Sequence, residues 1–429
     1  MNYTEQSAAK KIESISPGTL VVGIGIAKAS HCAQFVDYRG IVVAEKAFFA
    51  NSREGFCIIL SKIEEASKAN GLKKVLAAFE PAGHYWKTLA FWLNSEGIRC
   101  VFVNPYHTKQ AKELSDNSQT KSGPKDALVI ARLANGGNFL EMRAPEGVYA
   151  SLRRLDSALE VVEKEQTALK NRITALMDEY FPEFFEVSKK PYGGKAAMQI
   201  LAECPLPRQI LCLGVDGVLE AVRKAAKAGV GAGKAARLFE AAGASIGSKH
   251  AQSEAAFEIS LMAGRLVLAD GSGAKILERM EAALEECLYA SFLLEIKGLG
   301  VATAGAIIGG AGNLAGFGSP RQIERLAGIN LREESSGARK GETRISKRGR
   351  AGLRKALWNA VEPMGIWDPG FKGLYQYYKT RAENPLRHKQ AMVALMRKLL
   401  AILHALAVKC ESYGPGIAFK NIGNEKNAA

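Results

Sequence analysis

The sequence predicts an α/β domain at the N-terminal end, followed by a chain that is almost entirely helical. Three observations support this fold class. Short apolar runs of strand length alternate with helix-like segments in the first third, apolar residues then recur at heptad spacing, and the later segments are rich in helix-forming residues. We therefore expect three domains, at residues 18–148, 149–290 and 291–415.

The order of elements in the first domain narrows the fold. Apolar runs separated by turn residues predict strands at 20–26, 31–37, 41–49, 74–79 and 99–103. N-cap residues, prolines and helical spacing predict helices that begin at Ser52, Tyr85, Pro105 and Pro124. Three strands followed by alternating helix and strand is the order expected of a ribonuclease-H-like α/β domain.

Two acidic residues stand where such a fold would do phosphoryl chemistry. Glu80 follows the strand at 74–79, and Asp126 lies in the first turn of the helix that begins at Pro124. Carboxylates at strand ends can share two Mg²⁺ ions and act on a phosphodiester. The alternatives are a solvated acid at a strand end for Glu80, and for Asp126 an acid that is stabilised by the helix dipole.

The middle domain begins with a heptad pattern. Its apolar positions, interrupted by one glutamine, are spaced alternately three and four residues apart: Leu152, Leu155, Leu159, Val162, Gln166, Leu169, Ile173, Leu176 and Tyr180. This spacing predicts a coiled coil through which two chains self-associate, in which case charges at Leu159 and Leu169 would abolish dimers. The alternative is an amphipathic helix packed within its own chain. Residues 190–288 are expected to be helices, and no role is assigned to them.

The last domain opens with a possible helix-hairpin-helix. Gly298 and Gly300 allow a tight turn after Lys297, and the helix that follows can present backbone N–H groups to a phosphate. The alternative is a plain helical hairpin.

A dense basic run follows at residues 332–355. Nine Lys or Arg residues are opposed by three Glu residues, and the hydroxyls of Ser335 and Ser336 lie near its start. Cations of this density suit a phosphate backbone, and a hydroxyl held among them could attack a phosphodiester. The alternative is a solvated loop that only grips nucleic acid. The expected contacts are Arg332, Arg339, Lys340, Arg344, Lys347, Arg348 and Arg350.

Composition agrees with an anionic partner. The net charge is +15 and the pI about 9.4, which favours a nucleic acid or an anionic surface. Seven scattered cysteines, with no Cys-x-x-Cys pair, indicate reduced thiols and neither a disulfide framework nor a zinc site. We expect no secretory signal, no membrane partner and a cytoplasmic, nucleoid-associated protein.

Short blocks in both end domains resemble one family. In chain order they are Gly-Ile-Gly-Ile-Ala-Lys (23–28), Phe-Glu-Pro-Ala-Gly (79–83), Val-Asn-Pro (103–105), Lys-Ser-Gly-Pro-Lys-Asp-Ala (121–127), Leu-Ala-Gly-Ile (326–329), Glu-Ser-Ser-Gly (334–337) and Ser-Lys-Arg-Gly (346–349). The chain resembles the DEDD-type insertion-sequence transposases, a family that includes the Piv DNA invertase and the bridge-RNA-guided recombinases. The resemblance covers residues 18–180 and 290–410.

The resemblance implies a mechanism and a set of partners. It implies a Holliday-junction-resolvase-like nuclease domain with four metal-binding acids, Mg²⁺ as cofactor, and dimers formed through the coiled coil. It also implies donor and target DNA and a structured guide RNA as partners. Ser335 would be the nucleophile that forms a serine–DNA intermediate, with Ser336 as the second choice.

This chain departs from the family pattern at two acids. Glu80 and Asp126 match the second and fourth, but Gly25 and Gly123 stand where the first and third Asp belong. Because divalent sites depend on the number of charged ligands, we expect weakened Mg²⁺ binding and impaired catalysis. The alternative function is a non-catalytic RNA- and DNA-binding protein derived from such a recombinase. A weaker alternative, an actin- or sugar-kinase-like ATPase, would need an acid and a Thr in the 23–28 loop, and both are absent.

Overall fold

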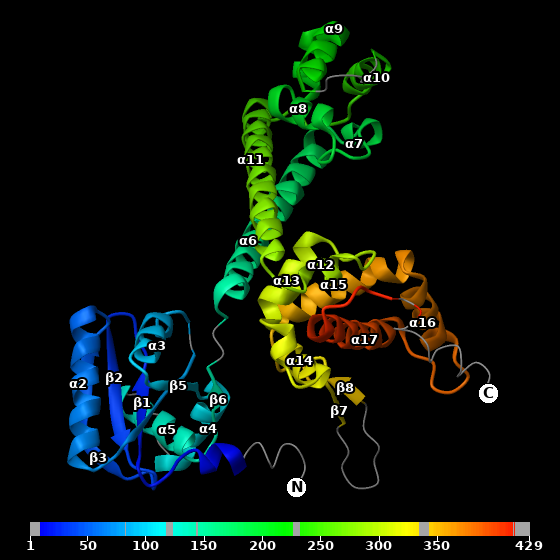
Figure 1. Cartoon of the computed structure of the whole chain (residues 1–429). Coiled ribbons are helices and arrows are strands. Elements are labelled where there is room, and N and C mark those ends of the chain that lie inside the picture. The colour runs from blue at the N-terminus through cyan, green and yellow to red at the C-terminus, as the bar shows by residue number, and fades with distance from the viewer. Residues whose placement is uncertain are drawn as a thin grey trace. The chain divides into compact units, whose positions relative to one another are not determined.

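The computed structural model describes residues 9–81, 83–116, 123–142, 145–225, 232–333, 343–414 and 416 (Figure 1). The chain forms two compact units, Met1–Ala144 and Pro145–Ala429. The first is mixed α/β and the second is mostly helical, as the sequence predicted. The boundary lies close to the predicted end of the first domain.

A six-stranded sheet forms the centre of the described part of the first unit. Its strands are β1 (Thr19–Gly25), β2 (Ser30–Val36), β3 (Val42–Ala50), β4 (Lys74–Phe79), β5 (Arg99–Phe102) and β6 (Leu140–Glu141). Their spatial order is β3-β2-β1-β4-β5-β6, with β1–β4 and β4–β5 parallel and the other neighbours antiparallel. This arrangement is consistent with the predicted ribonuclease-H-like domain. Strand β6 was not predicted from the sequence.

Helices cover both faces of the sheet (Figure 1). They are α2 (Arg53–Ala69), α3 (Trp86–Ser95), α4 (Pro105–Asp116) and α5 (Gly123–Asn135). Alternate β1 residues share one core cluster with α2 and α3, whereas Val21 shares another with α5. Ser52 caps α2 by accepting a hydrogen bond from the backbone N–H of Gly55, as its predicted N-cap role required. Because β1 is covered on both faces, it is the buried centre of the unit.

Two long helices, α6 (Gly147–Tyr180) and α11 (Gln252–Glu285), pair along the second unit (Figure 1). Ion pairs Glu165–Arg265 and Arg172–Glu258 show that the two helices run antiparallel. Gln166, the polar interruption of the heptad, donates a hydrogen bond to Asp270 of the same chain at 2.8 Å.

The heptad face of α6 packs within its own chain, which was the alternative to a coiled coil between two chains. Leu159 and Leu169 are 7% and 6% exposed because α11 and the neighbouring helices of the same chain cover them. The heptad face therefore forms an intrachain helix pair, and self-association through residues 152–180 stays a prediction.

This packing changes the expected effect of charges on α6. Leu159→Asp and Leu169→Asp should each cost about 3 kcal/mol or more, since each buries an unpaired carboxylate in the core. The control is Val161→Asp on the same helix, where the side chain is 65% exposed. Thermal unfolding by circular dichroism and molar mass by light scattering would measure both properties. Dimers that dissociate without any loss of stability would favour the interchain coiled coil instead.

The remaining helices build two cores in the second unit. The first core joins the C-terminal part of α6 and the N-terminal part of α11 to α7 (Phe184–Val187), α8 (Lys195–Glu203), α9 (Pro207–Ala225) and α10 (Ala232–Gly243). The second joins the other ends of α6 and α11 to α12 (Ala290–Leu294), α13 (Val301–Ala311), η1 (Leu314–Gly316), α14 (Pro320–Ala327), α15 (Ala351–Trp367), α16 (Pro369–Thr380) and α17 (His388–Lys409). The second of these cores therefore contains residues from both the predicted middle domain and the predicted last domain.

One helix in the described part of the chain, α17, is long and apolar enough to cross a membrane. Ten of its residues are buried, and those from Met392 to Ala407 belong to the second core of this unit. We therefore interpret α17 as a core helix.

Candidate functional site

The carboxyl ends of β1 and β4 meet at one edge of the sheet. Their parallel register pairs Ile24 with Phe79, so Gly25 and Glu80 follow one residue later on neighbouring strands. Side chains alternate between the faces of a strand. Since Ala78 lies in the core shared with α5, this alternation directs Glu80 toward the α5 face. The structure thus brings Glu80 to the edge where Gly25 lies.

The start of α5 packs closely on the same edge. A Cβ atom on Gly25 would lie 3.3 Å from the carbonyl oxygen of Gly123, and one on Gly123 would lie 3.7 Å from Cβ of Cys32. Cys32 is the β2 residue paired with Gly25. The two glycines at the missing acid positions are therefore neighbours, and both lie beside the ends of β1 and β2.

Asp126 already has a cationic partner. Its carboxylate Oδ1 lies 2.6 Å from Nζ of Lys112 on α4, and the two side chains are 20% and 23% exposed. Lys112 was not predicted from the sequence, because a lysine on a polar helix carries no signal of a contact with a residue on another helix.

The described side chains at this edge do not fit a divalent-metal site. Hard cations need several oxygen ligands with enough negative charge. This edge offers Glu80 and an Asp126 that is paired with Lys112. Among the described residues, no three His, Cys, Asp or Glu side chains are grouped so that they could hold a metal ion.

In the second unit, the predicted basic run forms a short two-stranded ribbon. Strands β7 (Leu331–Glu333) and β8 (Thr343–Ile345) pair antiparallel, with Arg332 opposite Arg344. Both arginines are exposed. Residues in directly opposite positions of an antiparallel pair point to the same face, so the two arginines lie on one face of the ribbon. Four predicted site residues lie outside the described part of the chain: Ser335, Ser336, Arg339 and Lys340.

The base of the ribbon is fixed to the end of α14. Gly328 ends that helix with φ +69°, and its carbonyl accepts a hydrogen bond from the N–H of Lys347 at 3.0 Å. A Cβ on Gly349 would lie 2.5 Å from the backbone nitrogen of Gly328. The Leu-Ala-Gly-Ile and Ser-Lys-Arg-Gly blocks therefore pack against each other, and the side chains of Lys347 and Arg348 are left exposed.

Arg350 makes a structural contact within the chain, and its role as a nucleic-acid contact stays a prediction. Its half-buried guanidinium donates to the carbonyl oxygen of Gly310, and Arg153 on α6 donates to the carbonyl oxygen of Gly309 at 2.8 Å. Burial lowers the pKa of Arg350. Both arginines satisfy carbonyl groups at the C-terminal end of α13, where positive charge is favourable.

The Lys297–Gly300 turn lies at the other end of α13. Gly298 has φ +96° and Gly300 is the N-cap, and both are exposed together with Lys297. An 11-residue helix spans about 16 Å, so this turn is separated from Arg350 by the length of α13. The helix that precedes the turn, α12, has five residues. The turn and the ribbon therefore do not form one compact patch, and the helix-hairpin-helix stays a prediction.

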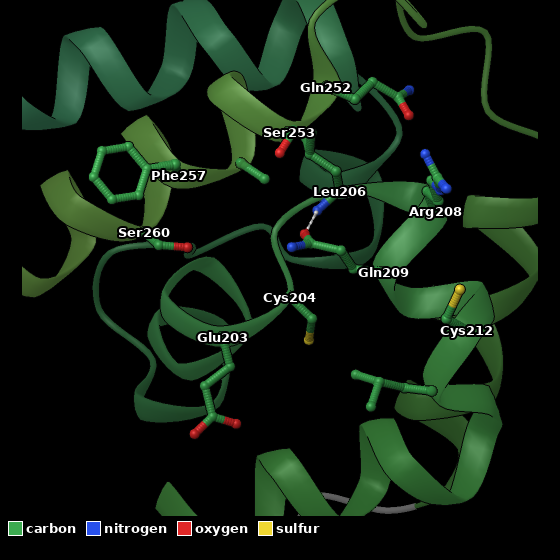
Figure 2. A pocket seen from close by; sticks show the side chains of 12 residues that line it. Glu203, Cys204, Leu206, Arg208, Gln209, Cys212, Gln252, Ser253, Phe257 and Ser260 are labelled. Carbon is green, nitrogen blue, oxygen red and sulfur yellow. Dashed lines mark hydrogen bonds between the residues drawn. The ribbon is translucent and has the colours of Figure 1, made fainter.

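A hollow of about 730 Å³ lies between α8, α9 and α11, and its lining includes none of the predicted site residues (Figure 2). Polar and apolar side chains both line it, including Arg208, Gln252 and Phe257. The backbone N–H of Leu206 donates to the side chain of Gln209 at 3.2 Å inside it (Figure 2). This hollow is in the helical part to which the sequence analysis assigned no role.

Two protein-family models match this chain. A family model for transposases, of the DEDD type found in IS110, matches residues 22–182. A second model, described as the transposase IS116/IS110/IS902 family, matches residues 290–376. Together they cover most of the first unit, α6, and the helices and ribbon around the basic run. The fold and these matches define an insertion-sequence transposase.

The chain belongs to the IS110 family of transposases. It is also 24% identical over 328 residues to the insertion element IS900 uncharacterized 42 kDa protein of Mycobacterium paratuberculosis, in an alignment that covers 75% of this chain and 80% of that protein. The family resemblance seen in the short sequence blocks is thereby confirmed. Residues 183–289, which include α7 to α11, match neither family model.

Proposed function

We propose that this chain acts on insertion-sequence DNA under the direction of a structured guide RNA, and that its strand-cutting activity is impaired. In the intact reaction, the Oγ of Ser335, or of Ser336, attacks a scissile phosphate and releases a DNA hydroxyl. This gives a serine–DNA phosphodiester. A hydroxyl of the partner strand then attacks that phosphodiester, joins the strands and frees the serine.

The contact between Gly25 and Gly123 carries the proposal of impairment. Both glycines lie at the edge that Glu80 reaches, and Asp126 beside them is paired with Lys112. Two acids at these positions would restore the charge that a hard cation needs. Their absence supports weakened Mg²⁺ binding as the reason for impairment.

Nucleic-acid binding is supported by different residues. The net charge is +15, and the exposed Arg332, Arg344, Lys347 and Arg348 cluster on and beside the β7–β8 ribbon. The N–H groups at the Lys297–Gly300 turn would add a phosphate contact. The positive charge supports association with the nucleoid. Membership of the family supports a guide RNA as partner. Self-association, through residues 152–180 or through another surface, stays a prediction.

A second candidate function rests on the same glycines. The chain would be a non-catalytic protein that occupies RNA and DNA without cutting. Nucleic-acid binding would survive in both cases, so only strand cleavage separates them.

A cleavage assay with Mg²⁺, guide RNA and cognate DNA tests the proposal. The structure favours Gly25→Asp/Gly123→Asp, because neither glycine has a positive φ and their added Cβ atoms would meet no backbone atom closer than 3.3 Å. The matched control is Gly25→Asn/Gly123→Asn, which adds the same volume without charge. We expect a covalent protein–DNA adduct with the Asp pair and none with the Asn pair.

Variants of the restored chain identify the nucleophile. The adduct should disappear with Ser335→Ala, or with Ser336→Ala if the second hydroxyl attacks. Equal cleavage by the unaltered chain would show that the two missing acids are not needed. Binding without cleavage in every variant would favour the occupancy function.

A further inference from the structure

The ion pair between Lys112 and Asp126 has a consequence for metal binding beyond the two missing acids. It joins α4 to the first turn of α5 at 2.6 Å, and both side chains are mostly covered. Asp126 is the acid that would serve a cation at this edge. The ammonium group of Lys112 is therefore already bound to the carboxylate that a metal ion would use.

The charge balance at this edge of the sheet is consistent with a lysine beside Asp126. Among the described residues, Glu80 and Asp126 are the acids at this edge, and the ammonium of Lys112 offsets one of these two charges. A metal ion that used Oδ1 of Asp126 would have to displace Nζ of Lys112 from the same oxygen, because two cations at that distance repel strongly.

The packing of α5 also fixes the position of its first turn. Gly25 and Gly123 let the first turn of α5 approach the ends of β1 and β2 closely. The Lys112 contact is made by the residue three positions further along that helix, Asp126. The helix start is therefore held by close backbone packing on one side and by an ion pair on the other.

We propose that Lys112 is the built-in cation of this site and takes the place of a divalent metal at Asp126. This inference rests on the proposed function, since that function assigns the missing acids to Gly25 and Gly123. It adds that restoring the two acids leaves a competitor in place. Full metal binding then requires the removal of the Lys112 charge as well.

Calorimetric titration of the full-length chain with Mn²⁺, without nucleic acid, tests the inference. The three proteins compared are Gly25→Asp/Gly123→Asp, the same chain with Lys112→Gln, and the same chain with Lys109→Gln. Lys109 is an exposed lysine on α4 and so controls for a change in general charge. We expect Lys112→Gln to tighten Mn²⁺ binding about tenfold or more over the double variant, and Lys109→Gln to leave it unchanged.

The outcomes separate the two proposals. Tight and equal binding by all three proteins would overturn the role of Lys112 and leave the four-acid assignment standing. Absence of binding in all three would overturn both the assignment and the inference. Equal tightening by Lys109→Gln would show that net charge alone acts, and would also overturn the inference.

A second measurement needs no added acid. In the otherwise unaltered chain, Lys112→Gln should speed amide hydrogen exchange in the first turns of α5, because the pair that holds this helix to α4 is lost. Lys109→Gln should not. Unchanged exchange in α5 with Lys112→Gln would show that the ion pair does not hold this edge.

Discussion

Gly23→Ala should destabilise the first unit by about 3 kcal/mol or more, whereas Gly25→Ala, two residues along the same strand, should cost less than about 1 kcal/mol. A Cβ on Gly23 would lie 2.1 Å from the carbonyl oxygen of Ala127 and 2.5 Å from the nitrogen of Ala131. Both atoms belong to the backbone of α5 and cannot turn away. The helix would have to leave the strand, which would open the core on that face.

Gly25 differs in what its new methyl group would meet. The nearest atom, the carbonyl oxygen of Gly123, lies at 3.3 Å, so a shift of a few tenths of an ångström would suffice. Loss of the conformational freedom of glycine in the unfolded chain offsets part of this cost. The first glycine of the 23–28 block is thus a packing requirement, and the second is a position that can accept a side chain.

Hydrogen exchange followed by mass spectrometry would check this difference in the full-length chain. With Gly23→Ala, amides of β1 and α5 should lose protection while those of α15 and α17 in the other unit keep it. With Gly25→Ala, the pattern should match the unaltered chain. Similar losses in both variants would mean that α5 does not press on β1 at Gly23.

Local sequence signals were enough for most of the first unit. β4 has the predicted bounds, and β1, β2, β3 and β5 begin and end within a residue or so of their predicted limits, because apolar runs and turn residues mark them. β6 has only two residues, both exposed, and its strand geometry comes from pairing with β5. A segment of this kind has no local pattern, so only the folded sheet reveals it.

The heptad of α6 shows a second limit. Its spacing correctly predicts a long helix with one apolar stripe, but the same stripe can pack on a second chain or on a distant helix of its own. The partner is α11, whose buried residues Ile259, Met262 and Leu266 are also helically spaced. Periodicity describes each face and does not state which faces meet.

Charged residues show the same limit at the candidate sites. Arg350 and Arg348 are alike in a basic run, yet one is bonded to Gly310 and the other is exposed. Lys112 is important because it pairs with Asp126 of α5, and the spacing of residues along α4 does not predict that contact. Contacts between segments far apart in sequence thus distinguish Arg350 and Lys112 from the exposed Arg348.

The difference between exposed and internally bonded basic residues predicts how nucleic-acid binding should respond to salt. Replacing Lys347 and Arg348 with Gln should reduce the slope of log K against log salt by about 0.9 for each lost phosphate contact, or about 1.8 for both. Both side chains are exposed next to the ribbon that carries Arg332 and Arg344. Fluorescence anisotropy with labelled duplex DNA across a range of salt concentrations would measure the slope.

Two controls make the result specific to this surface. Lys189→Gln/Lys190→Gln removes an equally exposed basic pair beside the first core of the second unit, and should leave the slope unchanged. Arg350→Ala should lower the melting temperature, because the loss of a half-buried charged hydrogen-bond donor costs about 1–3 kcal/mol, while the slope stays close to that of the unaltered chain. An unchanged slope in the Lys347/Arg348 variant would place the phosphate contact elsewhere. A slope that falls with Arg350→Ala alone, without loss of stability, would return Arg350 to the binding surface.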